Sequence, residues 1–184
     1  QVLYTDNDAC VREDVGEIFK IKGDEAVVAA VRTDSKGVEK ALSNEDISLH
    51  SKVVESYGFT TSFNAGVVLF RTQAMCKFKL LEKMLDVQFH HNKEPLWTRG
   101  TNQPPFEIAA AKSLRTTHYF WNCRISSVEL VDMERLGLRE GSPLHWISRC
   151  RIFHPSAHQE LDPQRKTCSA FNAMLEKAEG RTVR

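Results

Sequence analysis

The sequence of 184 residues lacks the features that define several large classes of protein. No apolar run approaches the roughly 18 to 20 residues that span a bilayer, and the first residues do not form a signal peptide. The 25 Lys and Arg residues nearly balance the 24 Asp and Glu residues, which leaves a net charge of +1. This balance gives no reason to expect a nucleic acid or a membrane surface as a partner.

Cysteine is scarce and irregularly spaced. The five cysteines are odd in number and include no C-x-x-C pair, so the pattern argues against a disulfide framework and against a zinc-thiolate site. We expect most of them to be small, buried side chains. The sequence also lacks an Asn-x-Ser/Thr acceptor, which weakly disfavours a glycosylated secreted domain. The compartment stays open between the Golgi or secretory pathway and the cytoplasm.

The remaining composition is that of one ordinary globular domain covering residues 1–184. It is 41% hydrophobic and 27% charged, which is enough for a sizeable core. Short apolar runs predict strands, and apolar residues at helical spacing predict helices. Strands are expected at Val2–Thr5, Ala26–Val31, Gly66–Phe70, His118–Trp121 and Arg149–Phe153, helical segments at Glu13–Phe19, Thr72–Phe89, Phe106–Leu114 and Cys168–Ala178, and loops at Asp34–Asp46 and His90–Pro105. This alternation predicts an α/β fold with a mixed sheet flanked by helices.

The clearest predicted helix is Thr72–Phe89. Its apolar residues form one stripe that we expect to pack on the sheet, namely Met75, Phe78, Leu81, Leu85 and Phe89. The strand before it, Gly66–Phe70, is continuously apolar, as expected where a sheet is covered on both faces.

The first predicted strand ends in two carboxylates, Asp6 and Asp8, separated by one residue. Because side chains alternate along a strand, both lie on the same face. Oxygen ligands of this kind suit Mg²⁺ or Mn²⁺, whose remaining positions water and a diphosphate can fill. Taken alone the D-x-D pattern is weak, because a solvated turn or a helix-capping aspartate can have the same spacing.

The order of the later motifs is more informative. YTDNDACVREDVGEIF is followed by SFNAGVVLFRT, TNQPPFEIAAAK, YFWNCRI and RIFHPSAHQE. In order and rough spacing, this series resembles the second half of the retaining glycosyltransferases of family 8, among them the glycogenins and the bacterial galactosyltransferases. The resemblance covers nearly the whole chain. It implies a GT-A fold with a Rossmann-like mixed sheet, a nucleotide-sugar donor, usually UDP-linked, and a divalent metal, usually Mn²⁺.

An open α/β sheet that binds a nucleotide usually begins with several strand-helix units before the ligand-binding strand end is reached. Here the acidic strand comes first. We therefore expect the chain to be the carboxy-terminal portion of the fold, with an amino-terminal half missing.

The resemblance also implies a set of metal ligands. Asp6 and Asp8 match the D-x-D that holds the metal, and the first of them also lies near the donor ribose. His154 matches the histidine that closes the metal site, and a neutral imidazole is a sound ligand for Mn²⁺. The alternative is a hydrogen-bonded structural histidine. His158 is a weaker candidate ligand.

Two further motifs carry substrate contacts by the same resemblance. Asn64, Ala65 and Gly66 match the turn whose asparagine amide faces the donor sugar or the acceptor, although such a turn can also merely start a strand. Asn102 and Gln103 stand where the family commonly has Asp-Gln, near the reacting carbon. Asn102 keeps hydrogen bonding but cannot be an anionic nucleophile or a base.

A second departure from the family follows His154. The family usually continues with a glycine and a lysine that contacts the diphosphate, whereas this chain has no lysine before Lys166. Arg151, Arg165 or Lys166 could assist the metal in neutralising phosphate, or could simply be solvated. A retaining reaction in which the acceptor hydroxyl attacks from the face that the diphosphate leaves needs no strong protein nucleophile, so Asn102 is compatible with it.

The tryptophans suggest a contact with the acceptor, because indole faces match the C–H faces of sugars. Loop-borne Trp97 is the expected acceptor contact, and Trp121 is expected in the core. The acceptor itself would be a carbohydrate or a protein. The two departures also allow a noncatalytic domain of the same fold that binds a nucleotide or a glycan or acts as a scaffold. An unrelated phosphoryl-transfer enzyme ranks low, because no phosphate-cradling G-x-x-x-x-G-K-[ST] is present.

Overall fold

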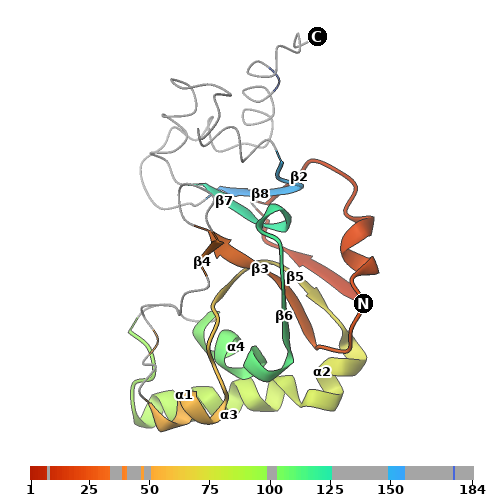
Figure 1. Ribbon diagram of the computed structural model, residues 1–184. Helices are drawn as coiled ribbons and strands as arrows, with labels where there is room; N and C mark the ends of the chain where they lie inside the picture. Colours follow the sequence, from red (N-terminus) through yellow and green to blue (C-terminus); the bar gives the residue numbers. More distant parts are fainter. Residues whose placement is uncertain are drawn as a thin grey trace.

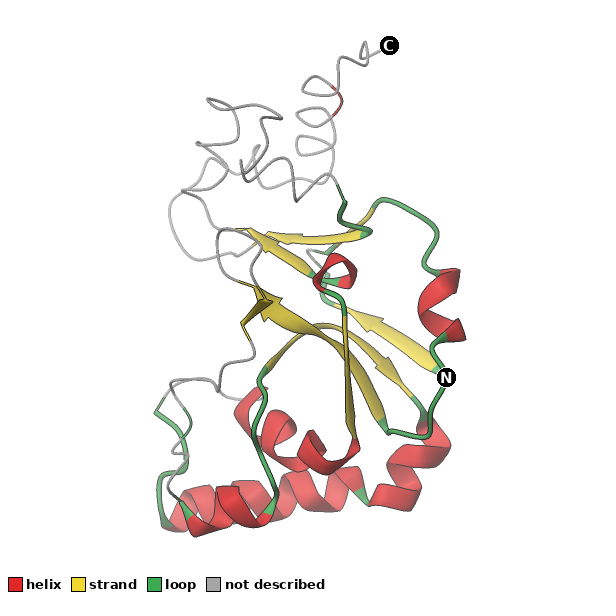
Figure 2. Ribbon diagram, in the orientation of Figure 1, coloured by secondary structure: helices red, strands yellow, loops and turns green. Residues whose placement is uncertain are grey.

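The structure is a computed structural model that describes residues 1–7, 9–33, 39–40, 47, 51–98, 103–125, 149–155 and 176. At residues 31–33, 39–40, 124–125 and 154–155 only the backbone is described. These residues form an α/β fold in which a mixed sheet has α-helices on one face (Figures 1 and 2). The predicted fold class is therefore confirmed. No helix among these residues has the length and apolar character needed to cross a membrane.

The main sheet places β5 between β1 and β3. β1 (Val2–Thr5) runs antiparallel to β5 (Phe63–Phe70), with Val2 opposite Phe70 and Thr5 opposite Val67. β3 (Val27–Thr33) is antiparallel to β5 on one side. On its other side β3 pairs in parallel with β6 (Leu114–Thr117) and antiparallel with the short β4 (Glu39–Lys40). Sequence reasoning found β1, β3 and β5 but missed β6.

Alternate residues of the central strands enter two different cores. Val27 and Ala29 of β3 face the helices, whereas Val28 and Ala30 pack on the opposite face with Trp121. Along β5, Val68 belongs to the first core, while Val67 and Leu69 belong to the second. This is the period of two expected for a strand. The sheet is thus covered on both faces, as the apolar run at the end of β5 predicts.

The helical layer consists of α1 (Lys52–Ser56), α2 (Thr72–Phe78), α3 (Leu80–Lys93) and α4 (Gln103–Ala110). The single helix predicted at Thr72–Phe89 is divided by Lys79, whose φ of 52° lies in the left-handed region. A non-glycine residue there interrupts helical hydrogen bonding.

The predicted apolar stripe is wrong for α3. Beyond the break, Leu80 and Val87 are buried and Met84 packs against the same core. Leu81, Leu85 and Phe89 instead leave 61%, 73% and 54% of their surface exposed. Both sets of residues have helical spacing, so periodicity alone could not choose between them.

The start of α4 also differs from the prediction. The helix begins at Gln103, so Pro104 and Pro105 lie in its first turn rather than in a loop. Proline is tolerated there because the first N–H groups of a helix have no intrahelical partner. The 3₁₀ turn η2 (Ala111–Ser113) follows, and β6 then begins at Leu114.

A smaller sheet contains β2 (Cys10–Val11), β8 (Ile152–Pro155) and β7 (Cys123–Ile125), in that order. The segment predicted as a strand at His118–Trp121 forms instead the 3₁₀ helix η3 (Tyr119–Trp121), which leads into β7. The helical turn predicted at Glu13–Phe19 is the 3₁₀ helix η1 (Gly16–Lys20). Most of the predicted loop at Asp34–Asp46 and all of the predicted helix Cys168–Ala178 except Glu176 lie outside the described residues.

The expectation of unpaired cysteines is wrong. Cys123 and Cys150 form a disulfide, with their Cα atoms 5.9 Å apart, and Cys10 is also disulfide-bonded. Cys76 is free and exposed. Spacing could not reveal the Cys123–Cys150 bond, because 27 residues of sequence separate two positions that the small sheet brings together.

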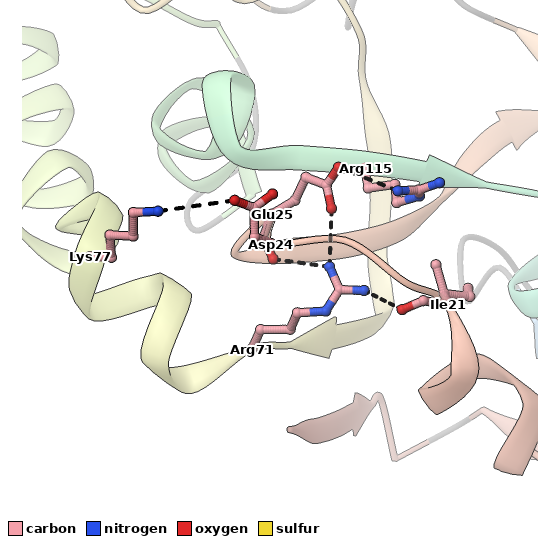
Figure 3. Close-up of polar contacts among 6 residues, drawn as sticks. All are labelled: Ile21, Asp24, Glu25, Arg71, Lys77 and Arg115. Atoms are coloured by element: carbon pink, nitrogen blue, oxygen red, sulfur yellow. Dashed lines mark hydrogen bonds and ion pairs between the residues drawn. The ribbon is translucent and has the colours of Figure 1, made fainter.

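A buried arginine fastens the turn before β3 to the start of α2 (Figure 3). Arg71 is only 7% exposed. Its Nη1 donates to the backbone oxygen of Glu25 at 3.2 Å and to Glu25 Oε2 at 3.1 Å, and its Nη2 donates to the Ile21 carbonyl. Arg115 approaches the other oxygen of Glu25 at 3.4 Å. The charge of Arg71 is therefore paired, as a buried guanidinium requires.

Candidate active site

Four of the sequence-predicted site residues meet at one cavity of about 510 Å³. They are Asp6 after β1, Ala65 and Gly66 on β5, and Gln103 at the start of α4. The rest of the wall is Tyr4 together with apolar side chains, namely Phe70, Met75, Leu80, Leu81, Met84 and Phe106. A largely apolar cavity with a few convergent polar groups is typical of small-molecule sites.

Asp6 is held where β1 leaves the sheet. Its backbone N–H donates to the Gly66 carbonyl at 2.8 Å, which extends the β1–β5 ladder by one bond. The Tyr4 hydroxyl donates to Asp6 Oδ1 at 2.7 Å. Tyr4 and Asp6 are two residues apart, so strand alternation puts both on the same face. The carboxylate is therefore oriented at the wall of the cavity.

The Asn64–Gly66 segment forms a bulge in β5. Between the pairs Ala29–Val68 and Val31–Phe63, β3 contributes one residue and β5 contributes four. The backbone of this bulge is bound by side chains: Asn64 Oδ1 accepts from the Gly66 N–H at 2.8 Å, and Asn122 Nδ2 donates to the Asn64 carbonyl at 3.1 Å. Asn64 is buried and its amide oxygen stabilises the turn, whereas Ala65 and Gly66 line the cavity.

Gln103 connects the bulge to α4. Its Nε2 donates to the Phe63 carbonyl at 3.1 Å and to Glu107 Oε1 at 2.7 Å. Glu107 is fully buried and also accepts from the Ser62 hydroxyl at 2.8 Å. A buried carboxylate needs such donors. Gln103 is thus fixed by two bonds at the edge of the cavity.

Three of the predicted site residues are not described in full. Asp8 and Asn102 lie outside the described residues, and only the backbone of His154 is described. The antiparallel β2–β8 ladder pairs Cys10 with Phe153. Phe153, the residue before His154, is therefore paired with a residue that follows the D-x-D motif by two positions in sequence. Within the described part of the chain, no three His, Cys, Asp or Glu side chains form a cluster that could hold a metal.

The placement of Trp97 does not support a contact with the acceptor. Trp97 is 6% exposed, belongs to the core under the helices, and pairs in an isolated bridge with Ile47. Its ring stacks on His91 with centroids 3.5 Å apart and planes at 9°. Little of the indole is left to meet a sugar. Trp121 is buried, as expected.

Of the three candidate phosphate helpers, only Arg151 is described, and it does not line the cavity. The Arg151 guanidinium lies over the Trp121 ring at 4.9 Å, and its Nε is 3.7 Å from Glu13. Arg165, Lys166 and His158 lie outside the described residues.

Sequence reasoning missed several residues of the site. Tyr4 could have been found from its position two residues before Asp6 on one face of a strand. Glu107 could have been found from its position four residues after Gln103 on one face of a helix. Asn122 carried no comparable signal, because its partner Asn64 is 58 residues away in sequence. The apolar wall was missed because the apolar stripe that contains Met75 and Leu81 was assigned to packing on the sheet.

The chain matches the family model of glycosyl transferase family 8 over residues 1–147, and it belongs to that family. Three solved structures with a similar fold share little sequence with this chain. The galactosyltransferase LgtC, solved with donor and acceptor sugar analogs, has a TM-score of 0.55 and 15% identity. The bifunctional glycosyltransferase WbbM has a TM-score of 0.58 and 13% identity, and the glycosyltransferase GlyE of Streptococcus pneumoniae has 0.56 and 15%. The mixed sheet flanked by helices is thus the GT-A fold of these glycosyltransferases.

These similarities cover nearly all of this chain but only part of each solved protein. They include 100%, 98% and 99% of this chain, against 62% of LgtC, 34% of WbbM and 44% of GlyE. A search of curated proteins found no match.

Proposed function

We propose that this chain carries the catalytic part of a metal-dependent, retaining glycosyltransferase that moves a sugar from a UDP donor to a hydroxyl of a carbohydrate or protein acceptor. One observation carries the proposal: in a member of glycosyl transferase family 8, Asp6, Ala65, Gly66 and Gln103 converge on one cavity. These residues come from β1, β5 and α4, which are distant in sequence. Their convergence supports a common role.

The donor set fits a hard divalent cation such as Mn²⁺ or Mg²⁺. Asp6 supplies a carboxylate at the cavity wall, and the β2–β8 ladder pairs Phe153, the residue before His154, with Cys10. Asp6, Asp8 and His154 would hold the ion. When bound, it would offset the negative charge of the departing diphosphate.

The remaining roles fall to groups that bind and orient the substrates. Ala65 and Gly66 offer backbone at the cavity, and the absence of a side chain at Gly66 lets a sugar approach closely. The Nε2 of Gln103 is engaged with Phe63 and Glu107, which leaves its side-chain oxygen as an acceptor for a sugar hydroxyl. Asn102 would add a hydrogen bond near the reacting carbon but no negative charge.

The transfer assay uses the full-length protein, a panel of UDP-sugars and Mn²⁺, with and without a chelator. Metal-dependent release of UDP, with a product of the donor's anomeric configuration by NMR, supports the proposal. Metal-dependent binding of UDP without turnover would identify the alternative, a noncatalytic domain of the same fold. That alternative rests on Asn102 and on the lack of a lysine between His154 and Lys166.

The disulfides support the secretory pathway as the compartment. Cysteines are kept reduced in the cytosol, whereas disulfides persist in oxidising compartments. The Cys123–Cys150 bond has both partners fully buried, and Cys10 is bonded as well. Localisation of the tagged full-length protein by microscopy, with co-staining of the Golgi and endoplasmic reticulum, tests this assignment.

A further inference from the structure

We propose that Asn122 is a positioning residue for the substrate cavity: its amide holds the Asn64–Gly66 bulge in the shape that the donor sugar meets. The expected effect of Asn122 on the donor sugar rests on the proposed function. The hydrogen bond from Asn122 to the bulge does not depend on that function. Asn122 follows η3 and lies 58 residues from Asn64 in sequence. It does not line the cavity.

The bulge depends on side chains because it leaves the β3 ladder. Three amide side chains bind the backbone of the bulge and of the residue just before it. Gln103 binds the carbonyl of Phe63, Asn122 binds that of Asn64, and Asn64 itself binds the N–H of Gly66. In addition, the backbone N–H of Asp6 donates to the Gly66 carbonyl. Asn64 and Asn122 do not line the cavity, and of these two only Asn122 lies outside the bulge.

Asn122 itself is firmly placed. Its backbone N–H donates to the Tyr119 carbonyl at 2.8 Å, and the next residue, Cys123, is tied to Cys150. On the other side of the disulfide, the Arg151 N–H donates to the Phe120 carbonyl at 2.8 Å. The donor of Asn122 is therefore aimed at Asn64 by the packing of two other segments.

The side-chain oxygen of Asn122 allows a role in positioning the bulge to be separated from a general contribution to the stability of the core. Asn122 is 3% exposed, and its Oδ1 has no hydrogen-bond partner among the residues that the structure describes. A buried acceptor without a partner is unfavourable. An apolar residue of similar shape would remove that penalty, at the loss of the bond to Asn64. Removal of the unsatisfied oxygen raises stability, whereas loss of the hydrogen bond to Asn64 lowers it. Only the loss of that hydrogen bond changes the bulge.

The test compares Asn122→Leu and the smaller Asn122→Ala with the wild-type full-length protein. Asn92→Leu is the control, because Asn92 is an exposed amide on α3 that accepts from Gln88. Amide hydrogen exchange of residues 64–66 is measured without ligand, together with thermal unfolding. The Michaelis constant for the donor and kcat are then measured with Mn²⁺.

Loss of one hydrogen bond at a buried carbonyl predicts a change of about tenfold. We expect residues 64–66 to exchange about tenfold faster in both Asn122 variants, while β1 and β3 exchange as in wild type. The KM for the donor should rise about tenfold with little change in kcat. Variants that lose stability but keep wild-type exchange at residues 64–66 and wild-type KM would overturn the proposal. If the wild-type protein binds no UDP, the proposed function fails, while the exchange comparison still decides whether Asn122 holds the bulge.

Discussion

The Tyr4 hydroxyl donates a hydrogen bond to Oδ1 of Asp6 over 2.7 Å, and both residues line the same cavity. The bond orients the Asp6 carboxylate at the cavity wall. A carboxylate that is oriented before a cation arrives loses less entropy on binding than a mobile one.

Asp6→Asn is expected to abolish Mn²⁺-dependent binding of UDP while leaving the fold intact, because it removes the charge from the candidate ligand. Tyr4→Phe should weaken the same binding by only about two- to fivefold, since it removes one partly exposed hydrogen bond. Calorimetric titration measures both effects, and thermal unfolding checks the fold. Asp24→Asn, at an exposed position outside the cavity, is the control. Wild-type affinity in Asp6→Asn would remove Asp6 from the site.

His154→Ala is expected to weaken Mn²⁺ binding by roughly 10- to 100-fold, the range for perturbed ligand shells. The matched control is His90→Ala, because His90 lies on α3 and does not line the candidate cavity. Titration with Mn²⁺ in the presence of saturating UDP gives the affinity. If the His154 variant binds as tightly as the control, the histidine is structural.

Gln103→Glu is expected to destabilise the protein at neutral pH by about 2 to 3 kcal/mol, because it replaces a donor to buried Glu107 with a second carboxylate. Repulsion between the two carboxylates raises a pKa of the pair in the folded state. The loss of stability is therefore present at neutral pH and shrinks as the pH falls through that raised pKa. Urea unfolding of the variant and wild type between pH 5 and 8 tests both points.

The control for Gln103→Glu is Gln73→Glu, an exposed position on α2. This change should leave stability nearly unaltered. A Gln103→Glu variant as stable as wild type, at every pH, would contradict the bond between Gln103 and Glu107.

The double variant Cys123→Ala, Cys150→Ala is expected to lose about 3 to 4 kcal/mol of stability, from the loop-closure entropy of a 27-residue separation. Because the disulfide joins the first residue of β7 to the segment just before β8, which contains His154, Mn²⁺ affinity should fall along with stability. Cys76→Ala, which removes the exposed free thiol, is the control. Equal stability of the two variants by chemical unfolding would argue against the disulfide.

Tyr57→Phe is expected to make the protein less sensitive to alkali. Burial raises the pKa of Tyr57, and the hydrogen bond from its hydroxyl to Asp86 at 2.6 Å raises it further. A raised pKa in the folded state contributes stability that is present below the unfolded pKa of about 10 and is lost as the pH rises above it. The wild type should thus lose stability more steeply above pH 10 than the variant, although the variant should be about 1 kcal/mol less stable at pH 8. Parallel curves of stability against pH would contradict the shift.

Sequence patterns predicted the parts of the molecule that depend on local periodicity. The strand before Asp6, the buried β5 and the carboxylate at a strand end all follow from short-range alternation. The family resemblance implied site roles for Asp6, Ala65, Gly66 and Gln103, and these four residues line one cavity.

The failures share a physical cause, which is that tertiary contacts decided between local alternatives. Two helical stripes were available in α3, and packing in the core buries the one that contains Leu80 and Val87. The sequence around Trp97 is typical of an exposed loop, but stacking on His91 and the bridge to Ile47 place Trp97 in the core. The Cys123–Cys150 bond depends on the pairing of β7 with β8, which no spacing rule contains.

The central claim, that Asp6 and its neighbours form a metal-dependent nucleotide-sugar site, is tested most directly by calorimetric titration of UDP into the full-length protein with Mn²⁺ and again after chelation. The account predicts saturable binding with Mn²⁺ that is lost on chelation and restored by adding the metal back. Absence of UDP binding to well-folded protein in the presence of Mn²⁺, or binding of equal affinity after chelation, would contradict it.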